Sequence, residues 1–193
     1  MPHKKYVGSY KFLQMEKYVA FLRGINVGGH HKVPMKDLKV VFEDTGFKSV
    51  VTILNSGNIL FEADQMPNES KISERLSAAF GFSIPVWVRT LKALETYSKS
   101  KPFEQVTNSN DTRLYVSFLR KKQNESLSLP WKSEDGSFII LQQIENCLFS
   151  VLDLSKSKTT KAMEIIEKFY QKDVTTRNWK TIQRIMKKAS QKK

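Results

Sequence analysis

The apolar positions of the chain change spacing repeatedly, from the close spacing of buried strands to the three-and-four spacing of amphipathic helices. Residues 18–22 form a short and almost wholly apolar run, which is typical of a strand buried on both faces. From Pro34 the apolar residues recur at helical spacing, and Gly46 provides a natural end. The proline suits a first helical turn, because its missing N–H has no partner there. The pattern therefore begins with a strand and a helix.

Two further runs, at 48–54 and 58–63, are rich in β-branched residues and are separated by only three turn-forming residues. This arrangement predicts a β-hairpin. A second amphipathic helix is expected from about Asn68 to a stop at Gly81, and a strand follows at 84–90. The order β-α-β-β-α-β is that of a ferredoxin-like unit.

The remainder of the chain repeats this order in a reduced form. After a short helix at 91–97, a strand is predicted at 113–119, but a polar stretch at 120–133 replaces the first helix of the unit. A hairpin over 138–152 follows, then a helix, a short strand near 173–176 and a last helix. The repeat concerns the order of elements and not residue identity.

We therefore expect an α/β protein of the α+β type, with two ferredoxin-like halves and mainly antiparallel sheets, the second half being degraded. The length of 193 residues and the 40% apolar content are sufficient for a real core. The expected division is an N-terminal extension at 1–14, a first half at 15–97 and a second half at 98–193 that ends in a basic helix.

The segment LRGINVGG, at 22–29, places three glycines directly after the first strand. In a sheet of order 4-1-3-2, the end of strand 1, the start of the first helix and the turn between strands 2 and 3 fall on one edge. A helix N-terminus adds unpaired N–H groups and a partial positive charge there. The spacing matches neither GxxxxGK[ST] nor GxGxxG. We expect a site for a phosphate or carboxylate oxygen formed by Arg23, Gly24, Asn26, Gly28, Gly29, Lys32, Asn55, Ser56 and Asn58.

The net charge of +13 is concentrated at the two ends of the chain. Residues 155–193 carry twelve Lys and Arg against three Asp and Glu, whereas residues 15–154 carry seventeen against sixteen. A basic end attracts polyanions weakly and without sequence preference. Stacking of RNA on the first strand is not favoured, because Tyr18 and Phe21 fall on opposite faces.

The sequence favours few kinds of catalysis. No apolar run is long enough to span a bilayer. Because the chain has one cysteine, Cys147, it contains no internal disulfide, which fits a reducing cytoplasm. Cys147 lies among apolar residues of a predicted strand, as is typical of a buried structural residue. His30 and His31 are adjacent and point apart, so they form no metal site. Either could act as a base and Ser56 as a nucleophile, but nothing in the sequence orients them. The sequence identifies no cofactor.

Four motifs occur in order along the chain: YVAFLRGINVGGHHKVPM, ILNSGNILFEA, VWVRT with a following KPFEQ, and VTTRNWKTIQRI. Together they resemble a family of bacterial proteins of unknown function, numbered 1697. The resemblance extends from about Met15 to Ile185. It implies a two-part fold of ferredoxin-like halves, and it implies no established activity, substrate, cofactor or catalytic residue.

The resemblance directs attention to TTRNW at 175–179. Asn178 is expected to cap the last helix and Trp179 to anchor it in the core. Alternatively, the repeat brings Arg177 and Asn178 toward a cleft between the halves, where pockets often form.

The leading hypothesis is a cytoplasmic protein that binds a small anionic or phosphorylated ligand at the glycine-rich edge. Non-specific nucleic-acid binding by the basic C-terminal region and a protein-interaction module are the alternatives.

Overall fold

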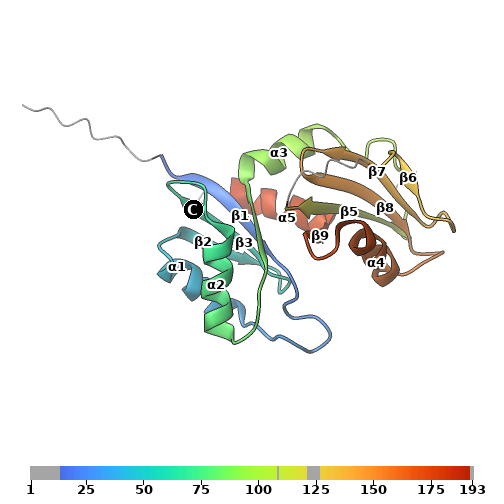
Figure 1. Ribbon diagram of the computed structural model, residues 1–193. Helices are drawn as coiled ribbons and strands as arrows, with labels where there is room; N and C mark the ends of the chain where they lie inside the picture. Colours follow the sequence, from blue (N-terminus) through green and yellow to red (C-terminus); the bar gives the residue numbers. More distant parts are fainter. Residues whose placement is uncertain (1–13, 108, 121–126, 192–193) are drawn as a thin grey trace, which may run out of the picture.

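The computed structural model describes residues 14–107, 109–120 and 127–191. Apart from Gln14, the predicted extension at 1–14 lies outside the described residues. The described chain contains two antiparallel sheets, which lie side by side, and five helices (Figure 1). This confirms the predicted α+β fold. No helix in the described part of the chain is both long and apolar enough to cross a membrane.

The first sheet has the strand order β2-β3-β1-β4, and all neighbours are antiparallel. This is the order of a ferredoxin-like unit, as predicted for this part of the chain. The turn between β2 and β3 passes through Asn55, Ser56 and Gly57. The elements are β1 (Glu16–Leu22), α1 (Met35–Asp44), β2 (Lys48–Ile53), β3 (Asn58–Ala63), α2 (Glu69–Phe80) and β4 (Val86–Thr90).

The ends of these helices follow local sequence signals. The Asn68 side chain caps α2 by accepting a hydrogen bond from the backbone N–H of Lys71 at 3.0 Å. Gly81 ends α2 in the left-handed conformation, with a φ of 79°. Pro34 differs from the prediction, because it is extended with a ψ of 132° and the first helical residue is Met35. It therefore stands one position before the first turn.

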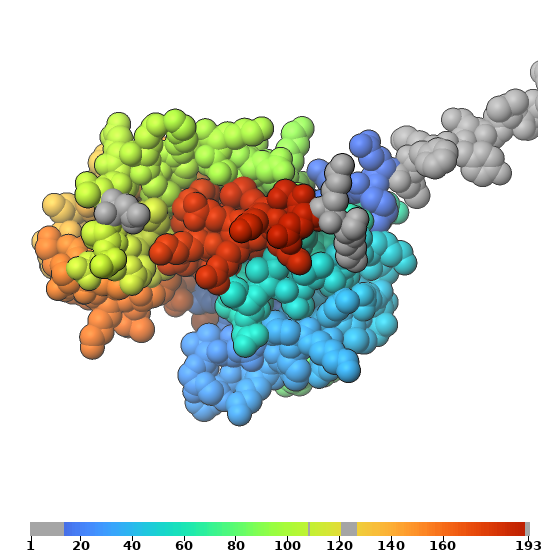
Figure 2. All heavy atoms as spheres, turned by 180° about the vertical axis from the view of Figure 1, so that it is seen from behind, coloured from blue at the N-terminus to red at the C-terminus, as the bar shows by residue number. Residues whose placement is uncertain are grey.

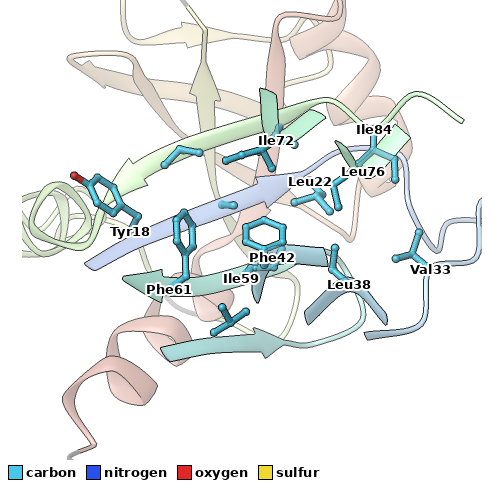
Figure 3. Close-up of a cluster of buried hydrophobic side chains, with 14 of the residues drawn as sticks. Tyr18, Leu22, Val33, Leu38, Phe42, Ile59, Phe61, Ile72, Leu76 and Ile84 are labelled. Carbon is cyan, nitrogen blue, oxygen red and sulfur yellow. The ribbon is translucent and has the colours of Figure 1, made fainter. Parts of the chain in front are cut away.

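One face of the first sheet packs against α1 and α2. Figure 3 shows Tyr18, Phe42 and Phe61 approaching one another from β1, α1 and β3. The ring centroids of Tyr18 and Phe61 lie 5.9 Å apart, and those of Phe42 and Phe61 lie 5.4 Å apart. These aromatic residues hold α1 on this face, and Ile72 and Leu76 of α2 pack in the same cluster, so the opposite face is left to meet the second sheet.

The second sheet has the order β6-β7-β8-β5-β9 and is also antiparallel. Without the short β6, this is again the ferredoxin-like order, with α4 as the second helix of the unit. Between β5 and β7 the described residues contain β6 instead of a helix, which agrees with the predicted degradation. The elements are α3 (Leu91–Lys99), β5 (Thr112–Leu119), β6 (Trp131–Lys132), β7 (Phe138–Ile144), β8 (Cys147–Asp153), α4 (Thr159–Tyr170), β9 (Val174–Asn178) and α5 (Trp179–Ser190).

A continuous apolar cluster joins the two sheets. Phe21 of β1 stacks on Phe118 of β5 with ring centroids 4.3 Å apart and an interplanar angle of 15°. Trp179, at the start of α5, packs in the same cluster and confirms the predicted core anchor. Because Tyr18 and Phe21 are both buried, the aromatic residues of β1 are not available to stack on bases.

A polar cluster at the same junction was not predicted. Glu69 accepts a hydrogen bond from Arg120 at 2.7 Å and another from the backbone N–H of Val88 at 2.7 Å. The Arg120 guanidinium also lies over the Trp87 ring, 4.4 Å from its centroid. A carboxylate of the first ferredoxin-like unit thus pairs with a cation of the second, next to a buried aromatic ring.

Cys147 is buried in β8 and free, in agreement with the prediction of a strand residue in the core. Burial raises the pKa of its thiol to about 11. The thiolate form is therefore scarce at neutral pH, which is typical of a structural cysteine and not of a nucleophile.

Candidate functional site

The glycine-rich segment after β1 forms a small hairpin. The backbone N–H of His30 donates to the carbonyl of Val27 at 3.1 Å, and the intervening Gly28 and Gly29 have φ values of 59° and 80°. Positive φ at both central residues is the geometry of a type I′ turn, which glycine adopts without strain. Val27 remains 69% exposed, and the segment projects beyond the sheet (Figure 1).

Asn26 fixes the base of this hairpin. Its side-chain nitrogen donates to the carbonyls of Val33 and Asn55 at 3.0 and 2.8 Å, and its oxygen accepts from the N–H of Val33 at 2.8 Å. These bonds use both amide N–H groups and the oxygen, so Asn26 ties the hairpin to the β2–β3 turn. The expected proximity of the two segments is therefore present, although the amide that mediates it is occupied.

Gly57 lies where the β2–β3 turn meets the hairpin. Its φ is 70°, and a Cβ atom there would lie 2.8 Å from both Ile25 Cδ1 and Leu22 Cβ. We expect Gly57→Ala to lower the free energy of unfolding by about 3 kcal/mol, from left-handed strain and overpacking together. Urea denaturation measures this loss.

The matched control for Gly57 is Gly28→Ala, because Gly28 also has positive φ but no atom within 4 Å of an added Cβ. Backbone strain alone should then cost about 1 kcal/mol. Equal losses for the two variants would show that the close approach to Leu22 and Ile25 does not constrain the turn.

A cavity of about 490 Å³ lies between the end of β1 and the edge strand β9. Its polar and charged side chains come from the β1 end, the β2–β3 turn, α4, β9 and α5, and its apolar wall from the hairpin, α4 and β9. The lining residues are Leu22, Arg23, Gly24, Ile25, Val27, Ser56, Met163, Ile166, Glu167, Val174, Thr175, Thr176, Arg177, Asn178 and Thr181.

Arg177 reaches from β9 to the first sheet. Its Nε donates to Asn58 Oδ1 at 2.6 Å, and its Nη2 donates to the backbone carbonyl of Leu22. Its Nη1 donates to Thr175 Oγ1 at 2.9 Å and to the carbonyl of Thr176 at 2.8 Å. Arg177 is half-buried and borders the cavity, and desolvation by the surrounding protein lowers the pKa of its guanidinium to about 10. In the described chain no carboxylate lies within 4 Å of it.

Arg23 bonds across the same junction from the opposite side. Its Nη1 donates to the carbonyls of Lys172 and Val174 at 3.0 and 2.9 Å. Its Nη2 pairs with Glu167 Oε1 at 2.6 Å, at a partly exposed position on the cavity rim. The charges of Arg23 and Glu167 offset each other, so Arg177 supplies the net positive charge of the lining.

Five of the eleven predicted site residues line the cavity, and six do not. The cavity brings together Arg23, Gly24, Ser56, Arg177 and Asn178, in accordance with the predicted approach of Arg177 to a cleft between the two repeats. The N-terminus of α1 is not part of the lining, contrary to the expectation. Neither the tip glycines of the hairpin nor the side-chain amides of the β2–β3 turn line it. The residues outside the lining are Asn26, Gly28, Gly29, Lys32, Asn55 and Asn58.

Sequence reasoning missed the α4 contribution and, on β9, that of Val174, Thr175 and Thr176. Met163, Ile166 and Glu167 of α4 fall on neighbouring helical positions, so the amphipathic pattern of that helix indicated their common face. Thr176 lies between Thr175 and Arg177 on β9 and has its side chain on the other face of the strand. Its cavity position follows from strand pairing, for which the sequence carries no local signal.

The candidate catalytic groups are not assembled around a reacting centre. The His31 ring stacks on Phe82 with centroids 4.2 Å apart, and its Nδ1 lies 3.2 Å from the carbonyl of Gly24. Ser56 Oγ accepts a hydrogen bond from Asn58 Nδ2 at 3.0 Å. The Asn178 side chain accepts from the N–H of Lys180 at 2.9 Å and caps α5, as predicted. Among the described residues no group of three His, Cys, Asp or Glu side chains could hold a metal.

The comparisons with known proteins identify relatives by family and by fold. The conserved bacterial protein SP0830 from Streptococcus pneumoniae is similar in structure, with a TM-score of 0.63 and 22% identity, over 90% of this chain and 98% of that chain. At this identity the likeness shows the fold alone. No curated protein matches the sequence.

The family model described as Protein of unknown function (DUF1697) matches residues 15–138. The match stops before the TTRNW segment, so it does not test the resemblance there. It nevertheless covers more than half of the sequence, and the chain therefore belongs to the DUF1697 family of proteins of unknown function.

Proposed function

We propose that this protein binds a small anionic ligand in the cavity between β1 and β9. The observation that supports this most directly is the Arg177 guanidinium, which lies half-buried at the cavity wall and, among the described residues, has no carboxylate within 4 Å. A buried cation without a counter-ion is costly, and an anion in the adjoining space offsets that cost. The cavity volume of about 490 Å³ lies within the range of small-molecule sites.

The hydrogen bonds of Arg177 define what kind of contact the ligand makes. Because its N–H groups donate to protein oxygens, the guanidinium attracts the anion through its charge and not through a bidentate bond. Side chains on the wall that bear polar hydrogens, such as Ser56 and Thr181, are available to position the ligand.

The test is the thermal stability of the full chain with inorganic phosphate, AMP, glucose 6-phosphate, octanoate and a short RNA, each at two salt concentrations. A ligand at about 100 times its Kd should add roughly 2.7 kcal/mol to the free energy of unfolding. We expect a small anion to stabilise the protein at both salt concentrations. If none of the four small anions stabilises it, the proposal is wrong.

A substitution that fills the cavity tests whether the anion binds there. We expect Met163→Trp, on the cavity wall, to abolish the stabilisation, because the indole occupies the ligand volume. Lys168→Trp is the matched control, since it adds an indole to an exposed position of the same helix that does not line the cavity. Equal losses in both variants would place the bound anion elsewhere.

Non-specific nucleic-acid binding is a second candidate function, supported by one face of α5. Lys180, Arg184, Lys187 and Lys188 are exposed there, and in the described chain none has an acidic partner within 4 Å. Figure 2 shows α5, in red, at the surface of the molecule. Stabilisation by RNA alone that disappears at high salt would favour this function. The protein-interaction module and the cytoplasmic location stay predictions.

A further inference from the structure

The edge strand β9 presents its backbone to the cavity in a regular pattern. The backbone N–H of Arg120 donates to the carbonyl of Asp173, in register with the pairing of Phe118 with Thr175 and of Val116 with Arg177. In an antiparallel pair every second residue directs both its N–H and its C=O toward the partner strand. The N–H and C=O groups of Val174 and Thr176 therefore point away from β5, toward the cavity that both residues line.

The outward carbonyls of this edge are already bonded. Arg23 donates to the carbonyls of Lys172 and Val174, and Arg177 donates to the carbonyl of Thr176. Neither the Val174 nor the Thr176 N–H has an acceptor among the described residues. The edge thus offers unbonded N–H donors, whereas each of these carbonyls already accepts a bond from an arginine. An added peptide strand needs both kinds of group, so the two arginines disfavour β-strand addition here.

The Thr176 N–H occupies a special position within this edge. It lies between the carbonyls of Val174 and Thr176, which Arg23 and Arg177 cover. An oxygen atom that accepts from this N–H is consequently flanked by two guanidinium groups. Such a combination of a backbone donor and nearby cations is the usual surrounding of a bound anion.

The remaining walls define the rest of the ligand. Ile25, Val27, Met163 and Ile166 give the same cavity an apolar lining. The charged lining residues are Arg23, Arg177 and Glu167, which together carry one net positive charge. A single negative charge balances this set, whereas a phosphate dianion would leave an excess negative charge beside an apolar wall.

We infer that the ligand is a monocarboxylate with an apolar body, whose carboxylate accepts a hydrogen bond from the Thr176 N–H between Arg23 and Arg177. This inference rests on the proposed function and specifies its ligand class. The apolar body packs against the wall formed by Ile25, Val27, Met163 and Ile166. Each buried methylene then raises the affinity about fourfold.

The first experiment titrates the full chain with octanoate, octanamide, octyl phosphate and acetate, each below its critical micelle concentration, and records ¹H–¹⁵N spectra. We expect octanoate to bind at least tenfold more tightly than octanamide and acetate, and to move the Thr176 amide proton downfield. Equal affinity for octanamide would overturn the carboxylate contact. Tighter binding of octyl phosphate would overturn the monocarboxylate and leave the proposed anion site intact. If no anion binds, and the phosphates have no effect in the stability test, both the monocarboxylate inference and the proposed anion site are wrong.

The second experiment removes the donor itself. Thr176→Pro deletes the N–H at an edge position where proline is tolerated, and Thr176→Val deletes only the hydroxyl. Thr176 Oγ1 lies 2.8 Å from Ser117 Oγ, so the Val variant measures what that contact contributes. We expect Thr176→Pro to weaken octanoate binding at least tenfold more than Thr176→Val does. Equal weakening would assign the contact to the hydroxyl, against the inference.

Discussion

Arg177→Met should lower the free energy of unfolding by about 3 kcal/mol, as measured by urea denaturation at neutral pH. The substitution leaves the carbonyls of Leu22 and Thr176 and the side-chain oxygen of Asn58 without their donor. A buried acceptor that loses its partner costs about 1–3 kcal/mol, and charged donors are at the upper end of that range.

Desolvation acts in the opposite direction. The pKa of Arg177 falls from 12.5 to about 10 on burial, so the neutral methionine recovers a cost of roughly 3 kcal/mol. The lost bonds outweigh this recovery, because five donor groups satisfy oxygens from four segments of the chain. The side chain therefore joins the two sheets as well as supplying the charge of the cavity.

Arg177→Lys separates these two roles. It keeps the charge, but a single ammonium reaches at most three of the acceptors, so about 2 kcal/mol should be lost. If Arg177→Met is as stable as the natural sequence, desolvation outweighs bonding, and the arginine is retained for its charge alone. Anion binding that survives in the lysine variant and not in the methionine variant would agree with that charge acting on the ligand.

Much of the fold was predictable because its signals are local. The apolar run at 18–22, the Asn68 and Gly81 helix ends and the Asn55–Gly57 turn each depend on a few neighbouring residues. Such signals fix the order of elements, and the ferredoxin-like strand order follows from that order. The first sheet was therefore expected in detail, down to the adjacency of β1 and β3.

The site was predicted less well, because its contacts are long-range. Arg23 was expected to face a ligand, but its partner Glu167 stands 144 residues later in the chain. The glycine pair was expected to approach a ligand, but a type I′ turn uses the same residues to reverse the chain. A sequence shows that such residues are special without showing which partner they meet. The register of β9, on which the Thr176 N–H depends, likewise has no local signal.

The division of the chain at residue 97 stays a prediction, and the junction between the sheets provides its test. Phe21 and Phe118 are fully buried and stacked on each other across that junction. We expect Phe21→Ala to lower the free energy of unfolding by about 4 kcal/mol, because it opens a large cavity in the shared cluster. Thermal unfolding should remain a single transition, since both sheets lose part of the same core.

A double-mutant cycle then measures the coupling between the sheets. Leucine replacements are preferable, because total stability is only about 5–15 kcal/mol and two alanines would unfold most of the chain. Phe21→Leu and Phe118→Leu should couple by about 1 kcal/mol through their lost stacking. The control pair is Phe42→Leu with Phe118→Leu, because Phe42 is equally buried but packs on the other face of the first sheet. This pair should be additive. The Phe21–Phe118 pair could instead couple no more strongly than the Phe42–Phe118 pair, or Phe21→Ala could unfold in two separate transitions. Either result would mean that the halves fold independently and that the cavity between them changes shape as they move.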